Sequence, residues 1–349
     1  ELMDIDRLFI VSSSTISKKT DEIDKIKDIL GKKFVGIFDS CEEHSPLENV
    51  VECAKKIKST RPDMILTVGG GTPIDTVKVS QLCLTLGIFS SAELKKISGK
   101  IQNVNSNIRQ IAVPTTLSGG EYSIVGGAMD TKRKLKEAYL GKDLCPQVVI
   151  LDPYISTHTP NWLWLSTAIR SIDHAIEGFC SNLKNPLINH NALETLRIFS
   201  NSLRETKDDC YNIKARSQSQ KAVWMIAKNM GNVTMGASHG IGYLLGSIGS
   251  VPHGQTSCVM LPAVLKWNED FHPEKDKMIA NALGRPNLKA YEAVKELIID
   301  LGLPHCLQDV GIGRDKYEKI VKYALENQTV LANPKPISKA DDIFEILNN

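Results

Sequence analysis

Residues 64–86 decide the fold class of this chain; they read MILTVGGGTPIDTVKVSQLCLTL. The apolar run 64–68 predicts a buried strand, and residues 77–86 predict a helix. Glycines between a strand and a helix allow the backbone to approach a phosphate, and the helix N-terminus favours an anion. The segment is neither G-x-G-x-x-G nor a Walker sequence, so either a phosphate-binding loop or a tight turn without a ligand fits it.

Strands and helices alternate through the first half of the chain. We expect strands at residues 7–14, 34–38, 64–68, 111–113 and 148–151, and helices at residues 21–30, 47–57 and 77–86. This alternation is typical of a parallel sheet with crossover helices, and therefore of an α/β domain.

The segment that follows the strand at 111–113 is rich in hydroxyl groups. Residues 114–121 read PTTLSGGE and offer three of them. Open α/β sheets bind their ligands at the carboxyl ends of the strands, which is where this segment begins.

Beyond residue 160 the alternation stops. The segments that fit helices are 162–180, 190–205, 215–245, 255–268, 275–283, 289–301 and 314–326. We therefore expect an α/β domain over residues 1–156 and an all-helical domain over residues 157–349.

Two histidines lie in an apolar, glycine-rich stretch, residues 229–268. His239 and Tyr243 are spaced i,i+4, so that on a helix they share one face. His253 follows Pro252, which places it near a loop-to-helix junction. Alone, these histidines fit a hydrogen-bonded core as well as a polar site.

A third histidine lies upstream, in the sequence AIRSIDHAIEG at residues 168–178. Arg170 and His174 are spaced i,i+4, and Glu177 adds a polar group one turn further on. Three histidines on separate apolar helices, in a chain that also has a candidate phosphate loop, favour a functional site over three unrelated core histidines.

The amino-acid composition argues against several classes of binding partner. Of the 349 residues 23% are charged and the net charge is +2, which is not typical of a nucleic-acid-binding protein. There is no run of eighteen apolar residues and no secretory leader pattern, and the eight cysteines form no C-x-x-C pair. We expect a cytoplasmic homodimer with a small-molecule substrate and with neither nucleic acid nor membrane as partner.

Taken together, these motifs resemble the iron-containing alcohol dehydrogenase superfamily. The matching positions, in chain order, are Gly69, Gly70, Gly71, Thr72, Asp75, Lys78, residues 114–116, residues 173–177, His239, residues 252–254, and Asn333 with Pro334. Residues 114–121, the basic run 132–134, and Ala215 with Arg216 look most like the maleylacetate reductase branch.

The resemblance implies a Rossmann-like first domain and an all-α second domain, the dehydroquinate synthase-like or iron-alcohol-dehydrogenase fold, with the active site in the cleft between them. It also implies a set of residues that hold the pyrophosphate and the nicotinamide. These cofactor residues are Ser13, Gly70, Gly71, Thr72, Asp75, Thr115, Thr116, Ser118 and Lys136.

Metal-dependent members of the family bind Fe or Zn through one Asp and three His. His174, His239 and His253 match the three histidines, but Arg170 stands where the Asp is expected. A guanidinium repels a cation and has no lone pair to donate. We therefore expect neither Fe nor Zn; if a metal were retained, the three histidines would be its ligands.

The predicted function is that of an NAD(P)H-dependent reductase that transfers hydride to a carbonyl or a conjugated enone. Its hydrogen-bond donors would be Arg170, His174, His239, Tyr243 and His253, with Tyr243 or His253 as the proton donor. Arg170 fits equally well as the partner of a substrate carboxylate.

The serines and threonine at 12–15, where the family often has an Asp, favour NADP(H) or the use of both NADP(H) and NAD(H). The alternative function is a non-redox dehydratase or isomerase on the same scaffold.

Overall fold

The chain forms two compact units, Glu1–Thr159 and Pro160–Asn349. The computed structural model describes residues 5–103, 105–133, 135–183, 185–228 and 230–349. The division lies three residues beyond the expected boundary at 156. Thr159 belongs to the first unit, where its hydroxyl donates to the carbonyl of Thr115 (2.7 Å). Lys134, part of the basic run used for the resemblance, lies outside the described residues.

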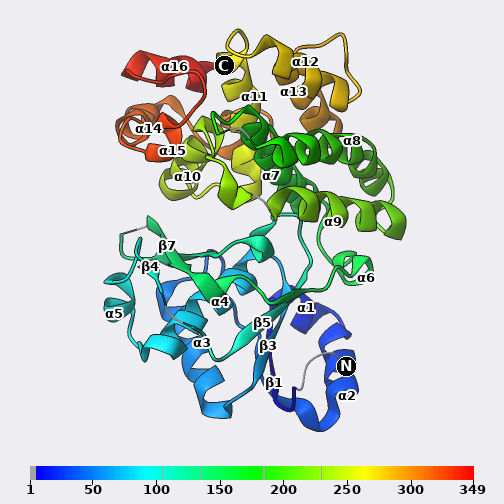
Figure 1. Ribbon diagram of the computed structural model, residues 1–349, viewed down its shortest axis with the longest axis vertical. Helices are drawn as coiled ribbons and strands as arrows, with labels where there is room; N and C mark the ends of the chain where they lie inside the picture. The colour runs from blue at the N-terminus through cyan, green and yellow to red at the C-terminus, as the bar shows by residue number, and fades with distance from the viewer. Residues whose placement is uncertain (1–4, 104, 134, 184, 229) are drawn as a thin grey trace. The chain divides into compact units, whose positions relative to one another are not determined.

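The first unit is built on a five-stranded parallel sheet, as predicted (Figure 1). Its strands are β1 (Leu8–Ser12), β2 (Phe34–Phe38), β3 (Met64–Gly69), β5 (Arg109–Pro114) and β8 (Val148–Val149), in the order β2-β1-β3-β5-β8. Every neighbouring pair is parallel, so the carboxyl ends of adjacent strands meet at one edge.

Helices cover both faces of this sheet, which is why the strands read as continuous apolar runs. Successive side chains point to opposite faces. Ile10 therefore packs with residues of α1 (Ser14–Lys19) and α2 (Glu22–Leu30), whereas Phe9 packs with residues of α3 (Leu47–Thr60) and α4 (Gly71–Leu86). The first unit has the Rossmann-like architecture expected.

A second, three-stranded sheet was not predicted from the sequence. It contains β4 (Ile101–Gln102), β6 (Val125–Asp130) and β7 (Leu135–Gly141) in the order β4-β7-β6. Ala128 and Tyr139 pack with Leu82 of α4. The inward positions of β7 include the buried Glu137, so the strand shows no apolar alternation in the sequence. The remaining helices of this unit are α5 (Ser91–Lys95) and α6 (Pro153–Ser156).

The second unit contains helices and no strand among the residues that the structure describes, which confirms the all-helical prediction. The helices are α7 (Asn161–Cys180), α8 (Pro186–Asp208), α9 (Ile213–Ala227), α10 (Ala237–Gly249), α11 (His253–Asn268), α12 (Pro273–Ala282), α13 (Ala290–Asp300), α14 (Tyr317–Ala324), α15 (Gln328–Leu331) and α16 (Ala340–Asn348). Within the described part of the chain, no helix combines the length and the apolar character needed to cross a bilayer.

One helix prediction was wrong. The segment 215–245 is not continuous: α9 ends at Ala227 and α10 begins at Ala237. Gly231 and Gly236 lie in the connection, and Gly236, in an extended conformation, is the N-cap of α10. Glycine lowers helix stability by roughly 1 kcal/mol relative to alanine, so the two glycines favour a break. The prediction followed the apolar residues of the segment and overlooked these glycines.

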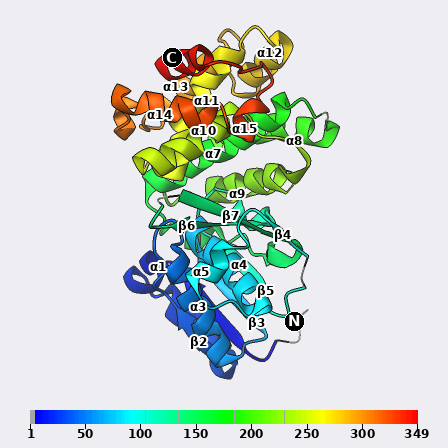
Figure 2. The same ribbon diagram turned by 90° about the vertical axis from the view of Figure 1, so that its left-hand side faces the viewer.

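The helices that carry the three histidines pack tightly in this unit, where α11 lies against both α7 and α10 (Figure 2). A Cβ atom on Gly254 of α11 would lie 2.8 Å from the backbone of Ser166 in α7. A Cβ atom on Gly240 of α10 would lie 2.8 Å from the backbone nitrogen of Val330 in α15. Glycine at these two positions sets the spacing between the helices.

Gly240→Ala should therefore lower the free energy of unfolding by about 1–3 kcal/mol, since backbone cannot give way as a side chain can. The matched control is Gly246→Ala on the same helix, where the nearest atom would lie 3.7 Å away. That variant should be neutral or more stable by up to about 1 kcal/mol. Equal effects of the two substitutions in urea denaturation would contradict this account of the packing.

Candidate active site

The predicted cofactor residues of the first unit gather at the carboxyl edge of the parallel sheet. Loops that follow β1, β3 and β5 are joined there by backbone hydrogen bonds. Ser13 donates to the carbonyl of Val68 (3.1 Å), and Thr115 donates to the carbonyl of Gly69 (3.0 Å). The order of the strands thus brings together three loops that are distant in sequence.

The glycine loop packs against the hydroxyl-rich loop without space for a side chain. A Cβ atom on Gly70 would lie 2.8 Å from Cγ2 of Thr116. The Thr116 hydroxyl is 3.2 Å from that of Ser118. Gly70 is also the N-cap of α4, and no side chain caps this helix end. The first-turn amides, including those of Gly71 and Thr72, can therefore bind an anion.

Asp75 and Lys136 form an ion pair of 3.8 Å beside this loop. Lys136 comes from β7, and the absence of a side chain on Gly127 of β6 leaves room for it. Lys78, one of the motif residues, is instead fully buried and donates to the carbonyls of Gly120 and Val125. These contacts give Lys78 a structural role, because its side chain connects α4 to the segment 120–125.

All five side chains proposed from the sequence as catalytic lie in one cluster in the second unit. The ring centroids of His174 and His239 are 4.8 Å apart, and those of Tyr243 and His253 are 5.4 Å apart and stacked. The rings of His239 and Tyr243 meet edge to face at 6.4 Å. The guanidinium of Arg170 lies over the Tyr243 ring, 5.4 Å from its centroid.

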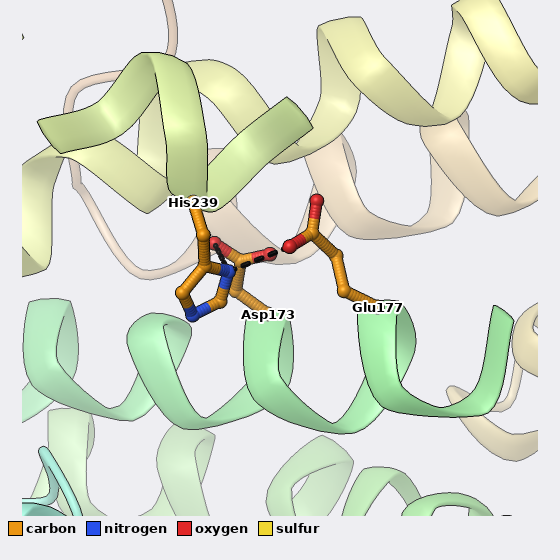
Figure 3. Close-up of side chains that lie close together, drawn as sticks. All are labelled: Asp173, Glu177 and His239. Carbon is orange, nitrogen blue, oxygen red and sulfur yellow. Dashed lines mark hydrogen bonds and ion pairs between the residues drawn. The ribbon is translucent and has the colours of Figure 1, made fainter. Parts of the chain in front are cut away.

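Glu177 of α7 connects this cluster to the start of α10 (Figure 3). Its carboxylate lies 2.7 Å from Nδ1 of His239 and accepts backbone hydrogen bonds from Gly236 (2.7 Å) and Ser238 (2.8 Å). One side chain thus caps the amino end of α10 and orients the imidazole that α10 carries. The sequence motif contained Glu177, but its role came only from the structure.

Asp173 is the second buried carboxylate of this network. Its Oδ2 accepts from the hydroxyls of Ser238 (2.8 Å) and Ser257 (2.6 Å). Arg170 approaches the same oxygen to 3.8 Å and donates to Ser257 (3.1 Å). Asp173 therefore links α7 to both α10 and α11. The i,i+4 spacing of Asp173 and Glu177 was the sequence signal that could have identified them as a pair.

Burial and these charges set the protonation of the histidines. Burial and the charge of Arg170 oppose a proton on His239, but the carboxylates of Asp173 and Glu177 outweigh them and raise its pKa to about 9. Burial, reinforced by the charges of His239 and Arg170, holds the pKa of His174 well below its usual value. At neutral pH the cluster holds an imidazolium at His239 beside a neutral imidazole at His174.

The imidazolium has one free donor. Its Nδ1–H is directed at Glu177, so that Nε2 carries the second proton. Nε2 is buried and has no hydrogen-bond partner among the described residues. A buried, unpaired N–H group is costly unless a ligand accepts from it, so a bound anion or carbonyl oxygen would satisfy it.

Asp173, Glu177 and His239 also place ligand-type atoms within 4.8 Å of one another. This set is already occupied by hydrogen bonds: Oε2 of Glu177 accepts from His239 and Gly236, and Oδ2 of Asp173 accepts from two serines. A cation there would have to displace the proton from His239. Together with Arg170, 3.8 Å from Asp173, the three residues form a network in which two carboxylates face two cations.

Two family models match this chain. The model for iron-containing alcohol dehydrogenase matches residues 1–153, and that for the C-terminal part of the Fe-containing alcohol dehydrogenase family matches residues 165–349. The chain belongs to the iron-containing alcohol dehydrogenase family. It is accordingly an oxidoreductase, and the family inferred from the motifs is confirmed.

Relatives within this family include both dehydrogenases and reductases. The chain is 32% identical to Dehydrogenase ALT3 of Alternaria alternata, with 98% of each chain covered. It is 27% identical to the maleylacetate reductase of Sphingobium indicum, with 91% of this chain and 82% of the relative covered. A solved sulfoacetaldehyde reductase from Bifidobacterium kashiwanohense, in complex with NAD⁺, shares the fold with a TM-score of 0.86, 21% identity, and 99% and 90% coverage.

Removing the carboxylate of Glu177 should lower the free energy of unfolding of the second unit. Glu177→Ala leaves two backbone N–H groups without this acceptor and leaves His239 only the longer contact with Asp173 (3.4 Å). Loss of one partner of a buried charge pair costs about 3–5 kcal/mol. Glu177→Gln keeps one acceptor oxygen and should lose less.

The control for that experiment is Glu194→Gln, which removes an exposed pair with Arg197 (3.2 Å) and should change stability by no more than about 1 kcal/mol. If Glu177→Ala denatures in urea at the same concentration as the Glu194 variant, Glu177 does not organise α10.

Proposed function

We propose that this protein is a nicotinamide-dependent reductase that adds hydride to a carbonyl or a conjugated enone. The observation that carries the proposal is the buried ring of His239: its Nδ1 lies 2.7 Å from the Glu177 carboxylate, and its Nε2 has no partner among the described residues. The two neighbouring carboxylates raise the pKa of this ring, which favours an imidazolium with Nε2–H as a free donor. When hydride adds to such a substrate, negative charge develops on its oxygen. A preorganised cationic donor stabilises that charge far better in a buried site than in water.

The roles of the cluster follow from its charges. His239 is placed to donate to the developing oxyanion, and the guanidinium of Arg170 adds a second positive charge nearby. Tyr243, which is 41% exposed, and the half-buried His253 are the more accessible groups, so we assign proton delivery to one of these two. Neutral His174 can accept or donate a hydrogen bond to orient the substrate.

The first unit supports nicotinamide binding through the uncapped amino end of α4 and the hydroxyls of Thr115, Thr116 and Ser118. A reduced nicotinamide, when bound, would supply the hydride. The sulfoacetaldehyde reductase that shares this fold was solved with NAD⁺, which adds support.

We further propose that NADPH is accepted at least as well as NADH. No carboxylate follows β1, where Ser13 caps α1, and the carboxylate of Asp39 accepts from the Ser17 hydroxyl (2.8 Å). An acidic side chain that bonds the ribose would repel a 2′-phosphate, and Asp39 is already paired. Dissociation constants for both cofactors test this. A tenfold preference for NADH that disappears in Asp39→Ala would contradict it.

We also propose that catalysis requires no Fe or Zn. The residues present do not suit a tightly held cation. Arg170, 3% exposed, occupies the position of the expected Asp ligand, and its guanidinium donates to the Ser257 hydroxyl within the cluster (3.1 Å). A metal would have to enter beside this buried positive charge, which repels a cation and offers no lone pair.

The redox proposal predicts steady oxidation of NADPH or NADH with a panel of α,β-unsaturated and saturated ketones and keto acids. Gly70→Val should abolish cofactor binding, because its Cβ would displace Thr116, while the variant still folds and unfolds cooperatively. No oxidation with any substrate, together with tight cofactor binding, would favour the non-redox alternative. Unchanged cofactor affinity in a folded Gly70→Val variant would show that the glycine loop is only a turn.

The metal proposal predicts less than one-tenth equivalent of Fe or Zn per chain by elemental analysis, and full activity after chelation. Arg170→Asp restores the ligand type expected in the family and should raise zinc affinity by at least tenfold, since it removes a positive charge and adds a donor. About one tightly held metal per wild-type chain, with activity lost to a chelator, would overturn the proposal.

A further inference from the structure

A second concave site lies in the helical unit, apart from the histidine cluster. It is a pocket of about 310 Å³ between α11, α13, α14, α16 and the segment 305–308. Its α11 residues run from Val259 to Lys266, which places them roughly 9–20 Å along the helix from His253. None of the five clustered side chains lines it.

The lining combines an apolar floor with a basic rim. The apolar part includes Val259, Met260, Ala263 and Ile346. The rim is formed by Lys266, Lys295, His305 and Arg314, and no Asp or Glu side chain lines the pocket. Such a one-sided distribution of charge around a concave surface focuses a positive potential into it.

Three of the four rim residues form no ion pair with any residue that the structure describes. Two basic side chains near the ends of α13 are paired: Lys289 with Glu269 (2.9 Å) and Arg285 with Glu296 (2.6 Å). Lys266, Lys295 and Arg314 have no ion pair within the described parts of the chain. Three like charges held together without counter-charges repel one another, and a bound anion would relieve this repulsion.

Asp309, an acidic residue close to the 305–308 segment, is directed away from the lysines and the arginine. Asp309 accepts backbone hydrogen bonds from His305 (3.0 Å) and Cys306 (3.3 Å), and it pairs with Nδ1 of His305 (3.3 Å). It therefore fixes His305 at the rim and leaves the two lysines and the arginine uncompensated. A carboxylate at Asn349 would offset one of their three charges.

We propose that this pocket binds a small organic anion that carries an apolar body and at least two negative charges, such as an aryl or acyl phosphate. The apolar floor would take the body of the ligand, and the rim would take the phosphate, which lysine and arginine bind through charge-assisted hydrogen bonds. The site is independent of the proposed reductase activity.

The test uses 1-naphthyl phosphate and its uncharged counterpart 1-naphthol, with binding to the full chain measured by calorimetry. Wild type should bind 1-naphthyl phosphate saturably and at least tenfold more tightly than 1-naphthol. Lys295→Glu should weaken phosphate binding at least tenfold. The matched control is Lys319→Glu, the same change of charge on exposed α14, outside the pocket; it should leave the affinity within twofold of wild type.

Arg314→Gln, at an exposed position, repeats the test with a neutral replacement in case Lys295→Glu does not fold. Both rim variants should leave the rate of NADPH oxidation unchanged, so that failure here is distinguishable from failure of the proposed function. Equal affinities in the Lys295 and Lys319 variants, equal affinities for the two ligands, or no saturable binding to wild type at millimolar ligand would each overturn the proposal.

Discussion

The buried contact between Glu177 and His239 is the interaction on which the helical unit and its candidate chemistry depend. Burying an ion costs several kcal/mol unless it is paired and hydrogen-bonded. Here two carboxylates, Asp173 and Glu177, face the two cations Arg170 and His239. Serine hydroxyls donate to Oδ2 of Asp173, and backbone amides donate to both oxygens of Glu177. The network joins α7 to α10 and α11, two consecutive helices that come much later in the sequence.

Two consequences follow from this network. First, the amino end of α10 is held by side chains of other segments: Glu177 accepts from Gly236 and Ser238, and the amide of Asn333 accepts from Ala237 (3.3 Å). Second, the same carboxylate that caps the helix also holds a proton on His239. Glu177 therefore contributes both to the position of the helix and, together with Asp173, to the charge of its histidine. In our proposal, protein-borne positive charge replaces the family's metal site.

Much of this arrangement could be predicted from the sequence. Parallel strands place their carboxyl ends at one edge, so the glycine loop and the hydroxyl-rich loop were expected to meet, and they do. The i,i+4 spacings placed His174 with Arg170, and Tyr243 with His239, on shared helix faces. The carboxylate network was not predicted, because Asp173 and Glu177 read as ordinary polar residues of a helix until their partners on α10 and α11 are known. The hairpin of β6 and β7 was missed because Glu137 occupies an inward position. The two helices α9 and α10 were predicted as one because the apolar residues on both sides of Gly231 and Gly236 hid the break that these glycines mark.

The protonation state of His239 tests the central claim most directly. In a sample labelled with ¹⁵N at histidine, the two ring nitrogens of His239, assigned by comparison with His239→Gln, can be followed by NMR from pH 6 to pH 10. Because the carboxylates raise its pKa to about 9, both nitrogens should carry protons at pH 7.5 and one should lose its proton only as the pH passes through that value. A neutral His239 at pH 7.5, with a single protonated nitrogen, would contradict the proposal that a buried imidazolium stabilises the oxyanion.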